Sequence, residues 1–261
     1  PYMSGDGFAD RIVIGEDGKP TCQMTLDDGT VTTGDYDLVP ILEKFCEQHP
    51  DFSYKGARAV LAFTGYEGIL GYRTSSSYAG SETYDQDRQA AAEVAKCLRE
   101  HGWELASHSW GHLDLGTVEW DRFQSDTDKW ESEVESLIGP TDIILFPFGA
   151  DLGDWHPYTM ENERFRYLYN AGFRYFCNVD SSQYWVQLGD DYLRQGRRNL
   201  DGYRMWKDMT AESEGRSRKL EDLFRAEDIF DKSRPTPVPD MYCCSNPGQR
   251  IAEHDRINIT L

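Results

Sequence analysis

Two clusters of carboxylate and imidazole side chains have the residue types of a hydrolytic metal site. A Thr-Leu-Asp-Asp-Gly run makes Asp27 and Asp28 neighbours just before a glycine turn. A His-Ser-Trp-Gly-His run places His108 and His112 four residues apart. Two imidazoles at this spacing can face one metal ion if the segment is helical or tightly turned. One Asp and two His would leave the fourth position of a zinc ion open for water, as in catalytic zinc sites.

This combination predicts a hydrolase that activates water. Water bound to a metal loses its proton near neutral pH, so the second carboxylate of the pair can accept that proton. Each cluster also has a simpler explanation. The aspartates could form an ordinary turn in a chain with 46 acidic residues, and the histidines could be solvent-exposed or core residues. Because the chain has six histidines, two at this spacing favour a site.

The elements that would position these clusters follow the alternation typical of parallel α/β architecture. Strands are expected at residues 21–26, 57–63, 103–107, 142–146, 173–179 and 199–206. Helices are expected at residues 36–48, 85–101, 118–138, 161–170 and 220–230. Both clusters directly follow a predicted strand, and ligands of parallel α/β proteins bind at the carboxyl ends of the strands.

The charge of the chain limits its partners. The 46 acidic and 27 basic residues give a formal net charge of −19 at pH 7. This balance argues against nucleic acid, anionic membranes and polyanionic substrates, and leaves neutral or cationic partners open. No apolar run has the length of a membrane span. Six cysteines show no metal-binding spacing, and four in helix-like or strand-like runs are expected to be buried thiols, namely Cys22, Cys46, Cys97 and Cys177. The neighbouring Cys243 and Cys244 have no assigned role.

The ordered motifs resemble those of polysaccharide deacetylases, carbohydrate esterase family 4. The aspartate run is similar to the family's T-F-D-D-G motif, with Leu26 in place of Phe, and the histidine run matches H-[ST]-x-x-H in full. The similarity covers residues 19–185. It implies an α/β fold, a distorted (β/α) barrel of about seven parallel strands. That barrel domain would span residues 1–206, with residues 207–261 as an irregular C-terminal extension packed on it.

The resemblance also implies roles for individual residues. It makes Asp27 the catalytic base and makes Asp28, His108 and His112 the ligands of a divalent metal, with Zn²⁺ as the expected ion. It implies a metal-dependent hydrolase that removes N- or O-acetyl groups from a carbohydrate. Such proteins usually act on cell walls or extracellular glycans. Export to the medium or the cell surface, with a signal removed, is therefore expected, as is a monomeric state.

The family's third motif, R-x-P-[YF]-G, is retained in part. Pro147 and Phe148 are kept, and the backbone N–H of Phe148 is expected to contact the oxyanion. Leu145 replaces the arginine that orients the catalytic aspartate in the family. A cation from another strand could substitute for it, and the candidates are Arg174, Arg197 and Arg198.

The last two motifs are weaker. The D-x-x-D-W motif keeps Asp180 but has Gln183 in place of its second aspartate. The L-x-H motif that supplies the general acid is not found, so His156 is the nearest alternative acid, although a surface histidine is the simpler interpretation. The predicted substrate-binding residues are Trp110, Pro147, Trp155, Asp180, Tyr184 and Trp185, and core packing is an equally good explanation of the aromatic ones.

These departures leave two other functions open. Without the arginine and the acid, the chain could bind glycans with little or no turnover, because general acid–base transfer contributes about 10²–10⁴-fold in rate. A metal-dependent hydrolase of a non-sugar amide is the third possibility.

Overall fold

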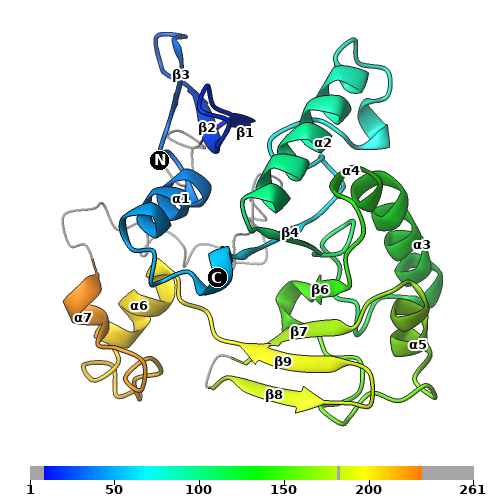
Figure 1. The fold of residues 1–261 in the computed structure, drawn as a ribbon. Coiled ribbons are helices and arrows are strands. Elements are labelled where there is room, and N and C mark those ends of the chain that lie inside the picture. Colours follow the sequence, from blue (N-terminus) through cyan, green and yellow to red (C-terminus); the bar gives the residue numbers. More distant parts are fainter. Residues whose placement is uncertain (1–8, 181–182, 231–261) are drawn as a thin grey trace.

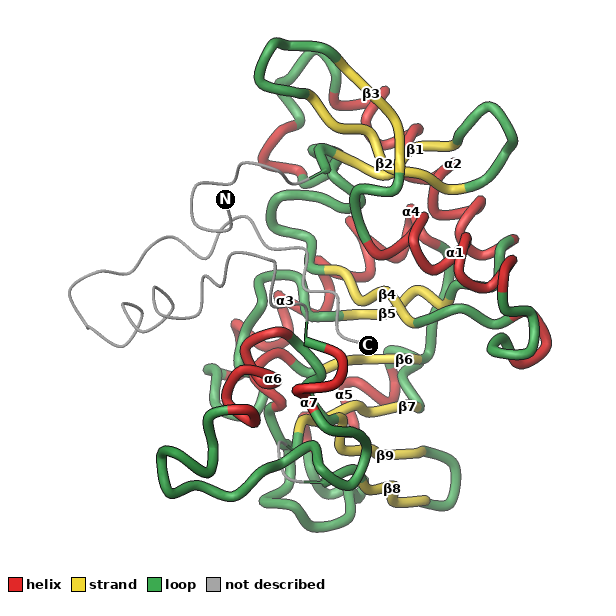
Figure 2. The backbone as a smooth tube through the Cα atoms, turned by 90° about the vertical axis from the view of Figure 1, so that its left-hand side faces the viewer, coloured by secondary structure: helices red, strands yellow, loops and turns green. Residues whose placement is uncertain are grey.

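The structure, a computed structural model, describes residues 9–180 and 183–230 and contains two separate sheets (Figure 1). An antiparallel sheet has the order β1 (Arg11–Ile14), β2 (Pro20–Thr25), β3 (Val31–Gly34). A six-stranded sheet has the order β4 (Val60–Phe63), β5 (Glu104–Ser107), β6 (Ile143–Leu145), β7 (Tyr175–Val179), β9 (Leu193–Arg197), β8 (Trp185–Leu188). Figure 2 shows the six strands stacked in this order below the smaller sheet.

Helices lie on both sides of the six-stranded sheet. The helices are α1 (Leu38–Gln48), α2 (Tyr84–Glu100), α3 (Trp120–Trp130), α4 (Ser136–Ile138), α5 (Glu163–Asn170), α6 (Gly202–Met209) and α7 (Ala226–Ile229). A π-helical turn, Glu131–Glu135, joins α3 to α4. Short 3₁₀ turns occur at Tyr54–Gly56, Ser76–Tyr78 and Pro147–Gly149. The helices α2 to α5 lie along one side of the sheet, whereas α1, α6 and α7 lie on the other (Figures 1 and 2).

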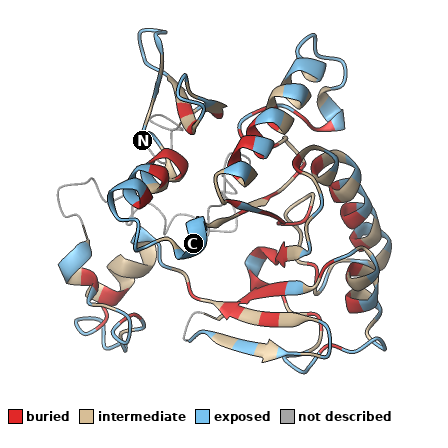
Figure 3. Cartoon of the chain, viewed as in Figure 1, coloured by how far each residue is buried: buried red, intermediate tan, exposed pale blue. Residues whose placement is uncertain are grey.

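The connections bring five strand ends to one edge. The strands β4, β5, β6, β7 and β9 are parallel, and β8 pairs antiparallel with β9. Because parallel strands run in the same direction, their carboxyl ends lie at the same edge of the sheet, which we call the carboxyl edge. The main core includes residues of β4 to β7 and of the helices α2, α3 and α5, and Figure 3 shows buried residues on these elements in red. A smaller cluster of Ala106, Leu145 and Cys177 is buried separately from it.

Most of the expected elements are confirmed. The predicted strands at 57–63, 103–107, 142–146 and 173–179 are β4, β5, β6 and β7. The predicted helices at 36–48, 85–101, 118–138 and 161–170 correspond to α1, α2, the α3–α4 unit and α5. The expected buried thiols are Cys22, Cys46, Cys97 and Cys177, whereas Cys243 and Cys244 lie outside the described residues. The α/β class therefore holds. The barrel is not confirmed, because the described strands form an open sheet with β4 and β8 at its edges.

The prediction that residues 21–26 begin a parallel sheet is wrong. They form β2, whose partners on both sides are antiparallel. The turn after β2 closes a hairpin, because the N–H of Leu26 donates to the carbonyl of Thr30 at 2.8 Å. Gly29 has φ +82°, which glycine adopts without a Cβ clash. An Asp-Gly pair between two β-forming runs is a strong hairpin signal, and here it makes β3 run antiparallel to β2.

The strand expected at 199–206 is a helix instead. Asp201 caps α6, because its side chain accepts a hydrogen bond from the N–H of Arg204 at 2.7 Å. The predicted domain boundary after residue 206 falls inside α6. Of the helix expected at 220–230, the last part forms, as α7. The β8–β9 hairpin was not expected from the sequence.

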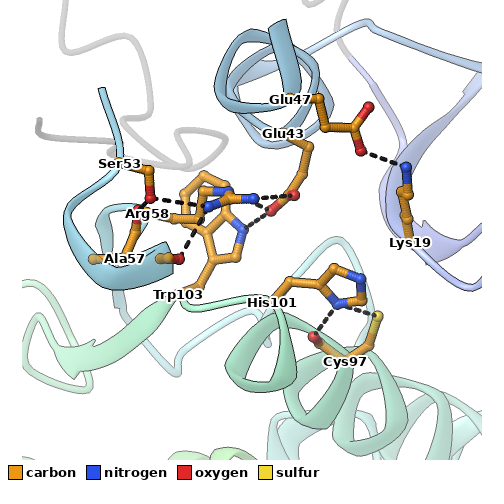
Figure 4. A network of polar contacts seen from close by, with 10 residues as sticks. Lys19, Glu43, Glu47, Ser53, Ala57, Arg58, Cys97, His101 and Trp103 are labelled. Atoms are coloured by element: carbon orange, nitrogen blue, oxygen red, sulfur yellow. Dashed lines mark hydrogen bonds and ion pairs between the residues drawn. The ribbon is translucent and has the colours of Figure 1, made fainter. Parts of the chain in front are cut away.

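A buried polar network joins α1 to the amino end of the large sheet (Figure 4). Glu43 accepts a hydrogen bond from the indole N–H of Trp103 at 2.6 Å, just before β5. The same carboxylate pairs with Arg58, just before β4, at 3.1 and 3.2 Å. Glu43 is buried, and it is held by donors from two segments that are distant in sequence. The network therefore positions α1 relative to β4 and β5.

Replacing Glu43 with glutamine is expected to lower the free energy of unfolding by about 1–3 kcal/mol, because a neutral amide leaves buried donors of Arg58 and Trp103 poorly paired. Urea unfolding measures the change. Glu47→Gln is the matched control: it lies one turn along α1 and pairs with Lys19 at the surface. Its expected cost is about 0–1 kcal/mol. Equal losses in the two variants would contradict a structural role for the Glu43 network.

No helix among the residues that the structure describes combines the length and the apolar character needed to cross a membrane.

Candidate active site

His108 stands at the carboxyl edge immediately after β5. Its N–H donates to the carbonyl of Phe63 at 2.9 Å, which extends the strand pairing by one residue. Its ring Nδ1 lies 2.7 Å from the carbonyl oxygen of Leu145. A carbonyl can only accept, so Nδ1 carries the proton and Nε2 presents its lone pair. The side chain is 6% exposed, and burial lowers the pKa of His108 to about 4. The imidazole is therefore neutral at pH 7.

His112 turns back toward His108. The two ring centroids are 5.0 Å apart, and the His112 ring lies 4.8 Å from the ring of Phe148. The turn between the histidines is held by Asp126, a buried carboxylate on α3. It accepts hydrogen bonds from the N–H groups of Trp110 at 2.8 Å and Gly111 at 2.6 Å. The structure thus brings the two predicted imidazoles together in a tight turn.

The loops at this edge have an unusual backbone. Seven non-glycine residues of the described chain have positive φ, and five of them follow β5 or β6. They are Ser109, His112, Phe148, Asp154 and Trp155, with φ between 48° and 65°. Such angles are uncommon for side-chain-bearing residues and persist where surrounding contacts enforce them. Strained backbone of this kind clusters at functional sites, which supports the carboxyl edge as the site.

Arg197, the last residue of β9, also belongs to this edge. Its Nη2 donates to the carbonyl of Phe146 at 3.4 Å, one residue beyond the carbonyl that holds His108. The register pairs Leu145 with Cys177 and Cys177 with Gln195. Side chains alternate along a strand, so Arg197 lies on the same face of the sheet as Gln195 and its paired neighbours Cys177 and Leu145. The charge of Arg197 contributes to the low pKa of His108, after burial.

The two other candidate arginines are engaged elsewhere. Arg174 donates to the carbonyls of Tyr169 and Phe173 and stacks 3.5 Å from the Tyr169 ring centroid. Arg198 forms a bidentate pair with Asp222 at 2.7 and 2.9 Å. Among the three, Arg197 is therefore the arginine of the site.

The predicted carboxylates are not part of this arrangement. Asp27 and Asp28 are exposed in the β2–β3 turn of the smaller sheet. The N–H of Thr30 donates to Oδ1 of Asp28 at 2.9 Å, and this bonding lowers the pKa of Asp28. No group of three or more His, Cys, Asp or Glu side chains that could hold a metal ion occurs within residues 9–180 and 183–230. The structure therefore joins His108 and His112 but does not bring Asp28 to them.

The predicted aromatic residues differ in their surroundings. The indole N–H of Trp110 donates to Glu133 at 3.0 Å, and the ammonium of Lys129 lies 4.4 Å from a ring centroid of Trp110. These contacts give Trp110 a structural role. Trp155 and Tyr184 are exposed, and the Trp155 ring meets the Trp185 ring edge-on at 6.1 Å. Trp155 and Tyr184 therefore have the exposed surface that sugar stacking requires.

The remaining predicted residues lie at or near the carboxyl edge. Pro147 is buried, and the backbone N–H of Phe148 donates to no acceptor among the described residues. Asp180 follows β7, and its N–H donates to the carbonyl of Arg197 at 2.9 Å. His156 is exposed, in the loop after β6.

An ion pair that the sequence analysis missed supports this loop. Arg194 is 0% exposed, and its Nη2 lies 2.6 Å from Oδ1 of Asp151. The guanidinium also donates to the carbonyl of His156 and lies 3.9 Å from the ring centroid of Tyr158. The other oxygen of Asp151 accepts from the N–H of Trp155. An arginine inside a strand-like run was the one sequence signal for such a pair, because a buried charge needs a partner.

No protein-family model matches the chain, and no curated protein matches it. Among solved structures, the chain is similar to a "putative polysaccharide deacetylase" from Mycobacterium smegmatis, with 15% sequence identity and a TM-score of 0.32. The match covers 60% of this chain and 64% of that chain, so it spans less than two thirds of the solved protein. Function therefore has to be inferred from the residues of the site.

Proposed function

We propose that this protein is a hydrolase that removes N- or O-acetyl groups from a carbohydrate at the carboxyl edge of its six-stranded sheet. The observation that carries the proposal is the pair of converging imidazoles, His108 and His112, at the ends of parallel strands. The order of the sequence motifs supports the same reaction. Exposed Trp155 and Tyr184 support a carbohydrate substrate, since aromatic rings stack on sugars.

Hydrolysis of an acyl group requires an acceptor for the proton of water and donors for the oxyanion. Where no metal takes the lone pair on Nε2 of His108, that lone pair can accept a hydrogen bond from water, and Leu145 keeps the ring in the required tautomer. The N–H of Phe148, which has no described acceptor, is a donor for the oxyanion. Phe148 is held in a left-handed conformation beside His112, which supports a fixed direction for this N–H.

A divalent metal, with zinc expected, is part of the proposal, and the residues fit it in part. A metal-bound histidine is neutral and donates its other N–H to a carbonyl or carboxylate, as His108 does. A catalytic zinc ion takes three protein ligands, whereas the described site offers two imidazoles. Asp28 as third ligand, Asp27 as base and His156 as acid stay predictions, as do a monomeric state and export.

Release of acetate tests the proposed function. The protein is expected to release acetate from at least one N- or O-acetylated oligosaccharide, with faster release when zinc is added and slower release after chelation. If Asp27 is the base, Asp27→Asn lowers the rate by about 10²–10⁴-fold. Asp17→Asn, in the exposed β1–β2 turn, is the matched control and should keep the wild-type rate. The absence of acetate from every sugar tested would contradict the proposal.

A glycan-binding protein without turnover is the second candidate. It is favoured by the place of Asp27 and Asp28 in the turn of the smaller sheet, because the predicted base and the predicted third ligand are then not among the residues grouped with the histidines. Calorimetric binding of an acetylated oligosaccharide, together with no acetate release, would favour this function.

A further inference from the structure

Arg197 is a largely buried cation without a counterion. Its Nε is buried and has no hydrogen-bond partner, and its described hydrogen bond is the 3.4 Å contact to the carbonyl of Phe146. Within residues 9–180 and 183–230 it forms no ion pair. Burial lowers the pKa of Arg197, because the charged form is poorly solvated there. An uncompensated buried charge is costly, so this guanidinium calls for an anion from outside the described chain.

The neighbours of Arg197 do not supply that anion. His108 is neutral, and burial raises the pKa of the Cys177 thiol, so it stays protonated. Gln195, on the same face of β9, donates its amide to the sulfur of Cys177 at 3.2 Å. By contrast, the nearby Arg194 and Arg198 each have a carboxylate partner. The chain has 46 acidic residues, yet none of those within residues 9–180 and 183–230 pairs with Arg197.

Arg197 and His108 both contact the carboxyl end of β6, from strands on its two sides. The imidazole donates to Leu145 and the guanidinium to Phe146, both at the end of β6. An anion at Arg197 would therefore lie at the same carboxyl edge as the imidazole pair, close enough to Arg197 to offset the charge that acts on His108. A guanidinium matches a carboxylate, to which it can donate two parallel hydrogen bonds.

We propose that Arg197 binds the acyl end of the substrate, first as the oxyanion and then as the carboxylate product. This inference rests on the proposed function for the identity of the anion. In the reaction, an oxygen of water forms a bond to the acetyl carbon, and the carbonyl oxygen becomes negative. The bond from that carbon to the sugar oxygen or nitrogen then breaks, the leaving atom takes one of the two protons of the attacking water, and the other passes to solvent. The product is acetate, whose charge Arg197 compensates.

Acetate and its neutral isostere acetamide test the proposal without turnover. Acetate is expected to bind the wild-type protein saturably in calorimetry, whereas acetamide binds far more weakly. Arg197→Gln should weaken acetate binding by roughly 10–100-fold, as expected for a charged hydrogen bond. Arg197→Lys should retain part of the affinity. The matched control is Arg166→Gln, on the exposed side of α5, which should bind acetate like the wild type.

Stability in the absence of ligand separates a binding role from a structural one. Removing an uncompensated charge should leave the melting temperature of Arg197→Gln equal to or above that of the wild type. A lower melting temperature with unchanged acetate affinity would overturn the proposal. If Arg197→Gln does not fold, two other measurements test the proposal: the difference between acetate and acetamide binding to the wild type, and the acetate affinity of Arg197→Lys. Equal binding of acetate and acetamide would overturn the proposal.

The two proposals fail in different ways. Acetate binding that depends on Arg197, without acetate release from any sugar, would contradict the proposed function and leave the anion site intact. Acetate release at the wild-type rate by a folded Arg197→Gln variant would contradict the role of Arg197 alone.

Discussion

Replacing Asp151 with alanine is expected to lower the free energy of unfolding by about 3–5 kcal/mol, because it leaves a buried charge unpaired. Its partner Arg194 is 0% exposed, so water cannot replace the lost carboxylate. Asp151 also accepts hydrogen bonds from the hydroxyl of Tyr158 at 2.8 Å and the N–H of Gly153 at 3.2 Å. The loop after β6 would therefore lose its main anchor together with the ion pair.

Urea unfolding measures this loss, and Glu214→Ala is the matched control. Glu214 pairs with Arg216 at the surface, where an ion pair contributes about 0–1 kcal/mol. In the double variant Asp151→Ala with Arg194→Met, the total loss should be smaller than the sum of the single losses, because neither charge remains. Similar losses for Asp151→Ala and Glu214→Ala would show that the buried pair does not support the loop.

Replacing His108 with alanine is expected to lower kcat/KM for acetate release by about 10²–10⁴-fold, because the neutral imidazole fixed by Leu145 is lost. His112→Ala should act in the same direction. If the two imidazoles work as a unit, the double variant should be about as slow as the slower single variant.

Acetate release from the substrate identified for the wild type gives these rates, and unfolding curves verify that each variant folds. His49→Ala is the matched control, because His49 is exposed at the end of α1, outside the site. A rate within tenfold of the wild type for His108→Ala would remove the imidazole pair from the mechanism.

Elements with a strong local period could be predicted from the sequence. In α2, the residues Ala91, Val94, Ala95 and Leu98 recur at helical spacing, and all four are buried. The strand β5 is short, its last three residues are buried, and the histidine motif directly follows it. The residues that give such a signal lie close together in the sequence, so the element can be predicted without knowledge of the tertiary structure.

Pairing between distant segments could not be predicted in this way. The residues of β2 are compatible with a parallel or an antiparallel neighbour, and the Asp-Gly turn decided between them. The strand β9 contains Arg194, which looks unsuited to a buried strand until Asp151, 43 residues earlier, is placed beside it. The β8–β9 hairpin was missed for this reason.

The same distinction applies to the site. The histidines are four residues apart, so one tight turn is enough to bring them together. A contribution from Asp27 or Asp28 would depend on how two separate sheets are placed, which no short motif specifies. The choice of Arg197 over Arg174 and Arg198 likewise needed the partners of all three.

The left-handed residues after β5 and β6 also bear on what a glycine at each position would do. Glycine would adopt the backbone angles of Ser109, His112 and Phe148 without the cost of about 1–2 kcal/mol that a side chain adds at each. The chain nevertheless keeps a hydroxyl, an imidazole and a phenyl ring at these three positions. These side chains make contacts of their own: the hydroxyl of Ser109 accepts a hydrogen bond from the N–H of Leu113 at 2.9 Å, and the rings of His112 and Phe148 lie 4.8 Å apart. A glycine at any of the three positions would remove such a contact together with the strain, and would add chain entropy that folding has to overcome.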